Sequence, residues 1–565
     1  MQNPTMQSTV KSTKTLPLLS ASLLCAAIAS ATFAGGVTIQ PRAGDPLNGL
    51  TKLQLSRFDL GRTAYVTPFT IEAGLGPTFN KSNCQSCHSN PVGGWGSISV
   101  TRFGIEDKGE FSPLEELGGS LLQSLAISDP CREFLPIEAN VTAIRMTNSS
   151  MAYGMIEAIP DAAIAANDDP NDLNADGISG HVHWVLPLED SPSSPLRAGR
   201  FGWKAQVATV LSFSGDATKN EMGITNALLG SESAPNGNMA LLAACDTVAD
   251  PEDTADAGGF TFIQRVTHFQ RYLAQPPQTP KSGMSGEATF NAIGCNKCHI
   301  PQWTTSPSKS LETAIRGKSI RPYSDFLVHD MGTLGDGVQD GASSEQEMRT
   351  PTLWNLRTRD PMLHTGAASG GLFADRVTIA INAHGPFGEA AASAAAFAGL
   401  DSIARNGLIA FLDSLGRDEY DFNGDKVITM EDFQTLVACK ASASISPDDN
   451  CAIGDINQDG VVNTTDLDGF LLSFARAGYE VDLDCDGDGI VDLAEIFNGA
   501  PDTNNNAVPD ACECVGDFDN DSSVSASDLA TLLGLWGSPG GDLDNDGMTA
   551  ASDLATLLGN WGPCN

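Results

Sequence analysis

The pattern of apolar and polar positions first sets apart a short leader at the N-terminus. An apolar run from Leu16 to Ala34 follows Lys11 and Lys14 and ends in small residues suited to cleavage. This arrangement is typical of a secretory signal, so we predict a signal peptide over residues 1–34, with a retained membrane anchor as the alternative. No later uncharged stretch is long enough to span a bilayer, and we expect no transmembrane anchor once the signal is removed.

Helical patterns follow in three stretches of the chain. Residues 120–127 and 154–166 carry patterns expected of short helices. The alanine-rich segment Glu389–Leu415 is also helical in pattern, but it contains Asp401 and Arg405. Charges inside an apolar segment argue against a membrane span, so we predict a packed pair of helices there.

Two polar stretches separate these patterns. Gln275–Pro280 combines polar residues with three prolines and predicts a stiff linker between two regions. Residues 168–180 are rich in Asp, Asn and Gly, which is typical of a solvated turn; a calcium-binding loop is the alternative there.

The chain contains two copies of the sequence Cys-x-x-Cys-His. This spacing is that of a c-type haem attachment site, where each thiol adds to a haem vinyl group and the histidine ligates the iron. A redox or zinc-binding site is the alternative for one copy alone. Both copies are preceded by Phe-Asn at the same offset, which favours duplicated haem domains. The predicted haem-binding residues of the motifs are Cys84, Cys87, His88, Cys295, Cys298 and His299.

The 565 residues are 41% hydrophobic, which is enough to form several globular domains. Charge is distributed unevenly along this chain. The formal net charge of −38 argues against nucleic acid or an anionic membrane as a partner. From Arg417 to the end there are 30 acidic and 4 basic residues, so most of this charge lies in the tail. The acidic residues recur at fixed offsets, which a disordered tail does not require.

The cysteines agree with export. Of 13 cysteines, one lies in the predicted signal and four in the haem motifs, which leaves an even number for disulfides in an oxidising compartment. We predict the pairs Cys131–Cys245 and Cys439–Cys451. The pairing among the remaining four stays open: Cys485, Cys512, Cys514 and Cys564.

The tail repeats the frame of a calcium-binding loop. From Asp484, oxygen-bearing side chains occupy positions 1, 3, 5, 9 and 12, and Gly489 permits the turn at position 6. Four more copies begin at Asp455, Asp502, Asp517 and Asp542, and a degenerate copy at Asp421 has Lys426 in place of glycine. The predicted calcium ligands are Asp455, Asn457, Asp459, Asp466, Asp484, Asp486, Asp488, Asp492, Glu495, Asp502, Asn504, Asn506, Glu513, Asp517, Asp519, Asp521, Asp528, Asp542, Asp544, Asp546 and Asp553.

The last two loops form a direct repeat at a spacing of 25 residues, and each leads into Asp-Leu-Ala-Thr-Leu-Leu-Gly. This repeat resembles dockerin modules, in which paired calcium loops fold a small helical domain that docks onto a partner. The resemblance implies a cohesin-like partner; a calcium-stapled stalk without a docking role is the alternative. Residues 484–513 are closer to a generic calcium-loop spacer.

Residues from about 70 to 415 resemble the di-haem oxidoreductases related to bacterial di-haem cytochrome c peroxidases and to MauG. The motifs that carry the resemblance run in order along the region: GLGPTFNKSNCQSCH, NADGISG, GRFGWKA, EMGIT, the second CxxCH, YSDFLVHDMG, RTPTLWNL with MLHTG, and AINAHG. The family implies two mainly helical cytochrome c-like domains that face each other. One haem transfers electrons and the other meets peroxide.

The resemblance also implies roles for other histidines. In AINAHG, His384 stands where related peroxidases carry a ligand methionine, so we expect it to be the second axial ligand of the second haem, with Met331 as the alternative. His329 and His364 fall in motifs that line that haem. The remaining histidines are interpreted as surface or core residues: His181, His183 and His268.

The same resemblance implies catalytic residues at the first haem. Glu221 matches the distal glutamate that moves a proton between the peroxide oxygens, and Trp203 matches the tryptophan between the haems. Phe213 replaces the family's neighbouring glutamine. Glu157 is the alternative acid.

We therefore predict a mainly α fold, with two cytochrome c-like haem domains followed by an array of small calcium-loop repeats of the dockerin or EF-hand type. The predicted boundaries are a signal peptide at 1–34, the first, peroxidatic haem domain at 35–275, the second, electron-transfer haem domain at 281–416, a degenerate calcium loop or linker at 417–450, and dockerin-like repeats at 451–565.

The predicted function is that of an exported di-haem oxidoreductase of the cytochrome c peroxidase type, in the periplasm or at the cell surface, with two c-type haems and calcium as cofactors. We expect it to reduce hydrogen peroxide at the first haem with electrons that a small donor protein delivers through the second. The alternatives are MauG-like oxidation of a protein or organic substrate, and a non-catalytic surface cytochrome for electron transfer or docking.

Overall fold

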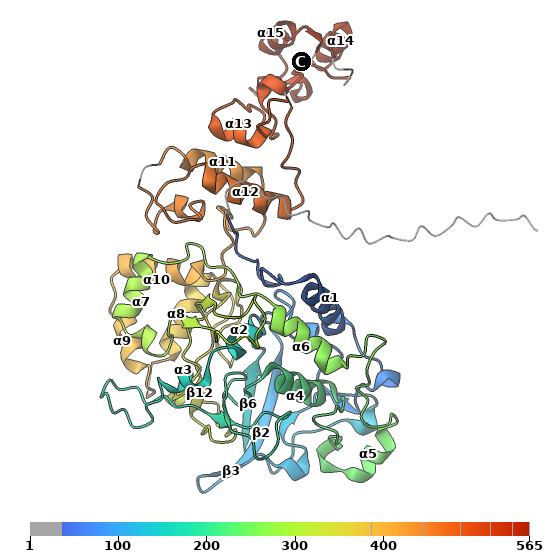
Figure 1. Ribbon diagram of the computed structural model, residues 1–565, viewed down its shortest axis with the longest axis vertical. Coiled ribbons are helices and arrows are strands. Elements are labelled where there is room, and N and C mark those ends of the chain that lie inside the picture. Colours follow the sequence, from blue (N-terminus) through green and yellow to red (C-terminus); the bar gives the residue numbers. More distant parts are fainter. Residues whose placement is uncertain are drawn as a thin grey trace, which may run out of the picture.

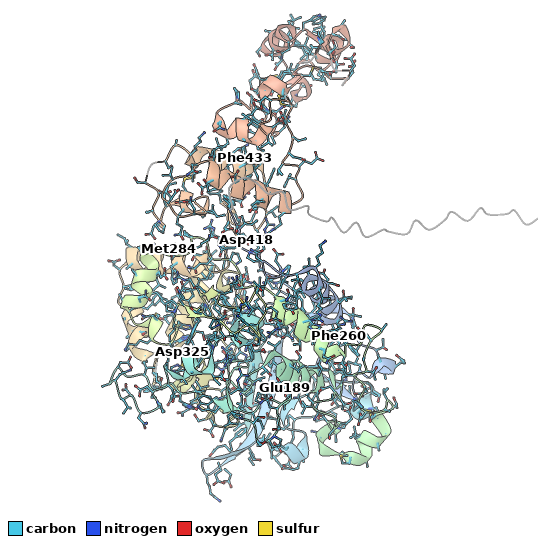
Figure 2. All side chains as sticks on the ribbon, in the orientation of Figure 1. Glu189, Phe260, Met284, Asp325, Asp418 and Phe433 are labelled. Atoms are coloured by element: carbon cyan, nitrogen blue, oxygen red, sulfur yellow. A yellow bond between two sulfur atoms is a disulfide. The ribbon has the colours of Figure 1, made fainter. Side chains whose placement is uncertain are left out.

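The computed structural model describes residues 37–385, 387–442, 444–485, 487–519, 521, 523–544 and 546–563. The predicted signal peptide and the predicted ligand Asp486 lie outside the described residues. The regions that contain the two haem motifs form a broad body, and an arm of small helical modules extends from it to the C-terminus (Figure 1). Met284 and Asp418 lie where the arm meets the body (Figure 2).

The first half of the body is built on three packed helices. α1 (Lys52–Val66) packs against α6 (Phe262–Tyr272), which in turn packs against α4 (Val210–Met222). The buried apolar residues of α6 recur at helical spacing and therefore face one core. In that core the ring centroids of Phe58 and Phe269 lie 5.2 Å apart.

Gly61 permits the close approach of α1 and α6. A Cβ atom at this position would lie 2.4 Å from the carbonyl oxygen of Arg265 and 2.8 Å from the amide nitrogen of Phe269. Both contacts are with backbone, which cannot turn aside as a flexible side chain does. A residue without a side chain is therefore required where the two helices cross.

An antiparallel sheet accompanies these helices, although the sequence predicts a mainly helical chain. β2 (Ser99–Asp107) pairs with β6 (Val141–Met146), β4 (Ser120–Leu122) and β3 (Glu110–Ser112). The helix predicted at 120–127 is therefore wrong. Pairing with a strand distant in sequence overrides the local helical pattern there.

The second half of the body is helical around the other haem motif. α7 (Ser285–Ala292) crosses α10 (Ser402–Ser414) so closely that a Cβ on Gly286 would lie 1.9 Å from the carbonyl oxygen of Gly407. The helices predicted at 389–415 and at 154–166 are confirmed: the first segment forms α9 (Ala391–Ala398) and α10, and the second forms α2 (Tyr153–Glu157) and α3 (Asp161–Ala165). The structure adds α8 (Phe373–Ala383), which the sequence analysis did not predict.

Short strand pairs complete the described structure. They are β1 (Thr78–Phe79) with β5 (Leu125–Ala126), β7 (Trp184–Val185) with β8 (Arg197–Ala198), β9 (Trp303–Thr304) with β10 (Ser319–Ile320), β11 (Val328–Asp330) with β12 (Glu347–Arg349), and β13 (Ser523–Val524) with β14 (Gly562–Pro563).

The predicted linker Gln275–Pro280 is part of the packed interior instead. Gln278 and Thr279 are buried, and the side-chain amide of Gln278 donates a hydrogen bond to the Tyr323 hydroxyl. The side-chain amide of Gln40 donates to the carbonyl of Gln278. The two haem regions are therefore joined through a shared core, because the proline-rich stretch makes tertiary contacts that its composition does not reveal.

The arm begins with two loop-and-helix units that share one core. α11 (Met430–Cys439) and α12 (Thr464–Arg476) pack with α13 (Asp492–Asn498) and with Ile39 from the start of the described chain. The segment 417–450, predicted as a degenerate calcium loop or linker, thus supplies α11 and part of the core of this module. A second module holds α14 (Ala526–Gly534) and α15 (Ala551–Gly559) around Val524, Leu532 and Leu557.

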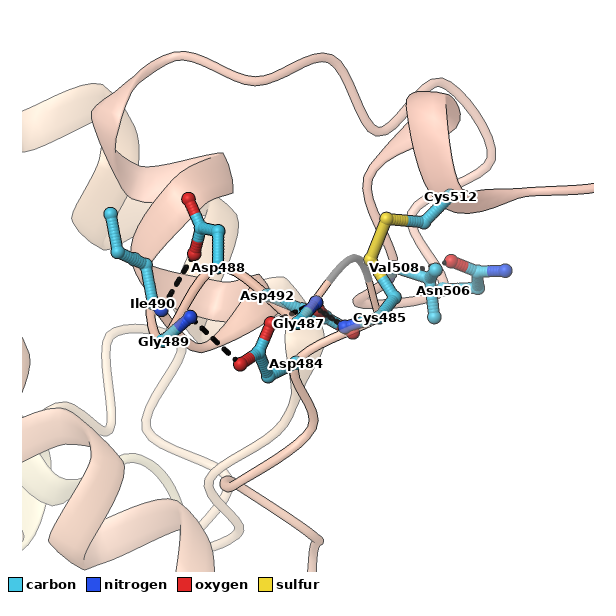
Figure 3. Close-up of a disulfide and its surroundings, with 10 residues drawn as sticks. All are labelled: Asp484, Cys485, Gly487, Asp488, Gly489, Ile490, Asp492, Asn506, Val508 and Cys512. Carbon is cyan, nitrogen blue, oxygen red and sulfur yellow. Dashed lines mark hydrogen bonds between the residues drawn. A yellow bond between two sulfur atoms is a disulfide. The ribbon is translucent and has the colours of Figure 1, made fainter. Parts of the chain in front are cut away.

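Disulfides link loops in both parts of the chain. The predicted pairs Cys131–Cys245 and Cys439–Cys451 are confirmed, the first tying the end of α5 (Met239–Cys245) to a distant turn. A third bond joins Cys485 to Cys512 within the arm (Figure 3). None of the helices in the described part of the chain is long and apolar enough to cross a membrane.

Replacing Gly61 with alanine tests the packing of α1 on α6. The added methyl group must displace backbone, so we expect Gly61→Ala to lower the free energy of unfolding by about 1–3 kcal/mol, measured by denaturant titration. Gly230→Ala is the control, because Gly230 is exposed and its Cβ would come no nearer than 3.7 Å to another atom. Equal effects of the two substitutions would contradict the packing argument.

Candidate functional site

The second Cys-x-x-Cys-His turn follows directly from α7. Gly294 has a left-handed backbone with φ of 86°, and a single turn then carries Cys295, Cys298 and His299. The amide of His299 donates to the carbonyl of Cys295 at 2.9 Å, which gathers the two thiols and the imidazole onto that turn. Neither cysteine is disulfide-bonded, and burial raises the pKa of Cys295 to about 12.

Two imidazoles face the cavity beside this turn, and each has one nitrogen fixed by backbone. Nδ1 of His299 lies 2.8 Å from the carbonyl oxygen of Tyr323, and Nδ1 of His384 lies 2.7 Å from that of Ala380. A carbonyl only accepts, so both rings carry their proton on Nδ1 and direct the Nε2 lone pair elsewhere. Burial lowers the pKa of His299 to about 4 and also lowers the pKa of His384. Both rings are therefore neutral, as metal ligation requires.

The cavity that both rings line comprises about 1300 Å³ of space not filled by protein atoms, part of it open to solvent. Its wall combines the groups that would attach and ligate a c-type haem with an apolar lining. The lining includes Cys295, Cys298, His299, His384, Met331, Phe290, Leu408 and Leu412. Free thiols at the attachment spacing, two neutral imidazoles with available Nε2 atoms and an apolar wall fit a c-type haem. Met331, the alternative ligand, lines the same cavity.

His329 forms a buried ion-pair network at the cavity wall. Its Nε2 lies 2.8 Å from the Asp325 carboxylate and its Nδ1 lies 2.8 Å from the Glu389 carboxylate. Burial lowers the pKa of His329, but the neighbouring Asp325 and Cys298 outweigh it and raise that pKa well above its usual value. A protonated imidazole between two carboxylates cannot ligate iron, so the structure gives His329 a role other than ligation.

The first Cys-x-x-Cys-His turn has the same backbone arrangement. The amide of His88 donates to the carbonyl of Cys84 at 3.0 Å, and neither Cys84 nor Cys87 is disulfide-bonded. Nδ1 of His88 is buried and makes no hydrogen bond of normal geometry with the described residues. Burial lowers the pKa of His88 to about 4. A neutral imidazole next to two free thiols fits a second c-type haem.

Glu221 is brought to this first turn from a distant part of the chain. It lies in the last turn of α4, where its carbonyl accepts from the amides of Asn80 and Lys81 and its carboxylate accepts from the Asn80 side chain at 2.8 Å. Burial and, next, the Glu221 carboxylate raise the pKa of Cys87 to about 11. Burial also raises the pKa of Glu221 itself. The glutamate that the motifs single out is therefore a partly buried carboxyl beside the first haem-attachment turn.

A tryptophan cluster joins the two motif regions. Trp203 lines the cavity of the second region and packs with Trp95, which follows the first haem motif in a Gly-Gly-Trp-Gly sequence. The Trp203 indole donates to the carbonyl of Met146 at 2.8 Å, which fixes its ring. The His364 ring lies 5.8 Å from it and also lines the cavity. Trp95 was not among the predicted functional residues, although its position shortly after the first haem motif could have indicated it.

Glu157 and Phe213 lie elsewhere around α4. The two carboxylate oxygens of Glu157 bind the amide of Val210, at the start of α4, and the guanidinium of Arg271. The Phe213 ring packs against the Tyr153 and Phe201 rings. Glu157 is thus engaged in an ion pair and a helix cap, which leaves Glu221 as the carboxyl that the structure brings to the first motif.

The histidines interpreted as surface or core residues are engaged with protein groups. His181 lies 2.7 Å from the Glu347 carboxylate, and His183 lies 2.7 Å from the carbonyl of Lys204. His268 stacks on Tyr272.

The loops of the arm fall into two geometric classes. In the loops that begin at Asp455, Asp517 and Asp542, the amide of position 2 donates to the aspartate at position 12, and a helix follows. The degenerate loop from Asp421 has the same closure, with Lys426 in a left-handed conformation at φ of 73°. The lysine therefore preserves the turn that glycine makes in the other loops.

The two remaining loops are shorter than the sequence frame suggests. The amide of Cys485 donates to Asp492 (Figure 3), and the amide of Thr503 donates to Asp510, so each loop closes at position 9. The predicted ligand Glu513 instead accepts from the Asn504 side chain. Asp510, which closes its loop, was missed because a twelve-residue frame was imposed on a nine-residue turn.

Comparison with known proteins agrees with the motifs. Residues 137–415 match the family model described as "Di-haem oxidoreductase, putative peroxidase". The match supports a di-haem oxidoreductase with haem as its cofactor. Solved structures similar to the chain include Kuenenia stuttgartiensis hydrazine synthase, at 13% identity over 68% of this chain and 98% of that chain with a TM-score of 0.28. A MauG-like protein associated with microbial copper homeostasis shows 13% identity over 67% and 94%, with a TM-score of 0.29. No curated protein sequence matches significantly.

Removing the His384 imidazole tests the pairing of the two rings across the cavity. Without a second strong ligand, the second haem of His384→Ala should change from low-spin to high-spin while the first haem is unaffected. Electron paramagnetic resonance and visible spectra of the oxidised full chain measure both. Met331→Leu is the control and should leave the low-spin signal intact. A low-spin signal that survives in His384→Ala and disappears in Met331→Leu would identify Met331 as the ligand.

Proposed function

We propose that this protein is an exported oxidoreductase that reduces hydrogen peroxide at the haem of the first motif, with electrons that enter through the haem of the second. The family match supports the coarser statement, a di-haem oxidoreductase. The observation that supports the peroxide-reducing function is the partly buried Glu221 carboxyl beside the first haem-attachment turn. Haem, when bound, supplies an iron that transfers electrons or acts on peroxide, depending on whether its sixth coordination position is filled.

The two motif regions differ in the side chains near the haem motif, which supports different roles for the two haems. In the second region, His299 and His384 line one cavity, and each presents an Nε2 lone pair because backbone fixes its Nδ1 proton. Two strong ligands are expected of a site for electron transfer. At the first motif, the structure brings a carboxyl group to the turn, and a carboxyl group is suited to proton transfer.

Glu221 is the residue proposed to move the proton during reduction of peroxide. In the overall reaction, peroxide, two electrons from the donor and two protons give two molecules of water. While the O–O bond breaks, the Glu221 carboxylate would accept the proton of one oxygen and pass it to the other, which leaves as water. Asn80 orients the carboxylate through a 2.8 Å hydrogen bond, and the two backbone bonds to the Glu221 carbonyl fix the end of α4 against the motif. Partial burial raises the pKa of the carboxyl, which brings its proton affinity closer to that of the reacting oxygens.

The tryptophan cluster is the proposed route between the two haems. Trp95 follows the first motif in sequence, and Trp203 lines the cavity of the second region. Both are buried and pack in one cluster. A rigid, close-packed contact between the regions holds the two cofactors at a constant separation, which electron transfer requires.

The arm is proposed to bind calcium and to dock onto a cohesin-like partner outside the cytoplasm. Carboxylate oxygens of Asp517, Asp519 and Asp521 lie within 4.8 Å of one another, as do those of Asp542, Asp544 and Asp546. Carboxylates so close repel one another unless a cation neutralises them. A small electron-donor protein is the proposed partner of the body.

Glu221→Gln tests the proton-transfer proposal. The amide keeps the shape of the side chain but cannot accept the proton, so we expect peroxide turnover to fall about a hundredfold or more, with both haem spectra native. Because turnover needs the ionised carboxylate, activity of the unchanged protein should decline as pH falls through the raised pKa, and the variant should lack that decline.

The control for this experiment is Glu157→Gln, which removes a carboxylate already engaged by Arg271 and Val210. If peroxide turnover stays near normal in Glu221→Gln and is lost in Glu157→Gln, then Glu157 is the residue that transfers the proton. A protein that carries both haems but turns over no peroxide in any form would leave the electron-transfer alternative.

Calcium titration of the full chain tests the arm. We expect calcium to raise the melting temperature of the arm and chelator to lower it, because the ion neutralises neighbouring carboxylates. Calorimetry should find fewer bound ions in Asp542→Ala than in the unchanged protein. Asp482→Ala is the control, since Asp482 is an exposed acid outside the loops. The same number of bound ions in both variants would contradict the proposal.

A further inference from the structure

Two buried arginines line the cavity of the second haem motif without an acidic partner. Arg349 and Arg359 are 6% and 4% exposed, and both are part of the cavity wall. The described residues place no carboxylate oxygen within 4.0 Å of either guanidinium, whereas buried Arg145 and Arg200 both have one. Burying a charge without a counter-charge is costly, so an unpaired buried pair indicates a missing anion.

The hydrogen bonds of these arginines reinforce this conclusion. Arg349 donates from Nε to the carbonyl of Gly202 at 2.6 Å and from Nη1 to that of Thr350 at 2.8 Å. Arg359 donates from Nη2 to the carbonyl of Leu363 at 3.4 Å. Carbonyl oxygens orient a guanidinium but do not neutralise it, so both cations retain their full charge.

Arg359 is the less favourably placed of the two cations. Burial lowers the pKa of Arg359 to about 9, and the like charge of Arg349 lowers it too. Burial lowers the pKa of Arg349 to about 10, although Tyr153 and Asp325, whose carboxylate is bonded to His329, act in the opposite direction. Two guanidinium groups that line one cavity can bind an anion with two negative groups.

The position of Arg359 shows which edge of the cavity this is. Its guanidinium carbon lies 3.4 Å from the centroid of the Trp95 ring and 5.5 Å from that of Trp203. The arginines therefore lie beside the tryptophan cluster, at the side of the cavity that faces the first motif. Cys295 and Cys298 line the same cavity from α7 and the turn that follows it.

We propose that Arg349 and Arg359 anchor the two propionate carboxylates of the second haem. The haem is then fixed at two places, by thioether bonds to Cys295 and Cys298 and by ion pairs to the arginines. This orients the propionates toward the tryptophan cluster. The inference rests on the second haem of the proposed function and does not depend on peroxide chemistry.

The anchor predicts a change in the midpoint potential of the second haem. Ferric haem carries one more positive charge than ferrous haem, so a nearby cation disfavours the ferric form. Removing the cation also leaves a propionate charge uncompensated, which favours the ferric form further. The potential of the second haem should therefore shift downward in Arg359→Gln and in Arg349→Gln, and the first haem should shift less.

Spectroelectrochemical titration of the haem-loaded full chain measures both potentials. Arg359→Lys retains the positive charge and should stay closer to the unchanged protein than Arg359→Gln does. Arg200→Gln is the buried control, because Arg200 is paired with Asp161 and does not line the cavity; it should leave the second potential unchanged.

Three results would overturn the anchor. The first is that the midpoint potential of the second haem in Arg349→Gln and Arg359→Gln equals that in Arg200→Gln. Another is an equal shift in Arg359→Lys and Arg359→Gln, which would show that shape rather than charge matters. The third is a shift of the second potential when acetate is added to the unchanged protein, because the arginines would then be open to dissolved carboxylates. A chain that binds no second haem would instead contradict the proposed function itself.

Discussion

The backbone bonds to His299 and His384 are the interaction on which the second motif region depends. Each imidazole has its Nδ1 proton committed to a carbonyl, of Tyr323 and Ala380, so each presents the other nitrogen to one cavity. An imidazole that could rotate or protonate would serve poorly as a ligand. The helices α7, α8 and α10 are arranged so that both rings line that cavity, and the close crossing at Gly286 is part of that arrangement.

The contact between the two halves of the body connects this site to the rest of the molecule. The amide of Arg349 donates to the carbonyl of Trp203 at 2.8 Å, so a strand of the second half is tied to a loop of the first. The tryptophan cluster packs at the same place. One buried contact therefore supports the cavity wall, separates the two motifs and fixes their distance.

Local motifs were the part of the molecule that sequence could predict. Both haem motifs were predicted from spacing, because their chemistry requires short, fixed separations. Two disulfide pairs were predicted from the even number of cysteines left outside these motifs, and both are confirmed. The sheet at residues 120–122 and the burial of Gln278 could not be predicted, because they depend on contacts with segments far along the chain. Arg349 and Arg359 were missed for the same reason: an unpaired charge is visible only once the surrounding residues are placed.

The different roles of the two haems can be tested by the electron paramagnetic resonance spectrum of the oxidised, haem-loaded full chain. We expect two ferric signals of equal amount: a low-spin signal from a haem ligated by two histidines, and a high-spin signal from a haem whose sixth position is open to peroxide. Two low-spin signals would contradict this expectation, because neither haem would then be open to peroxide.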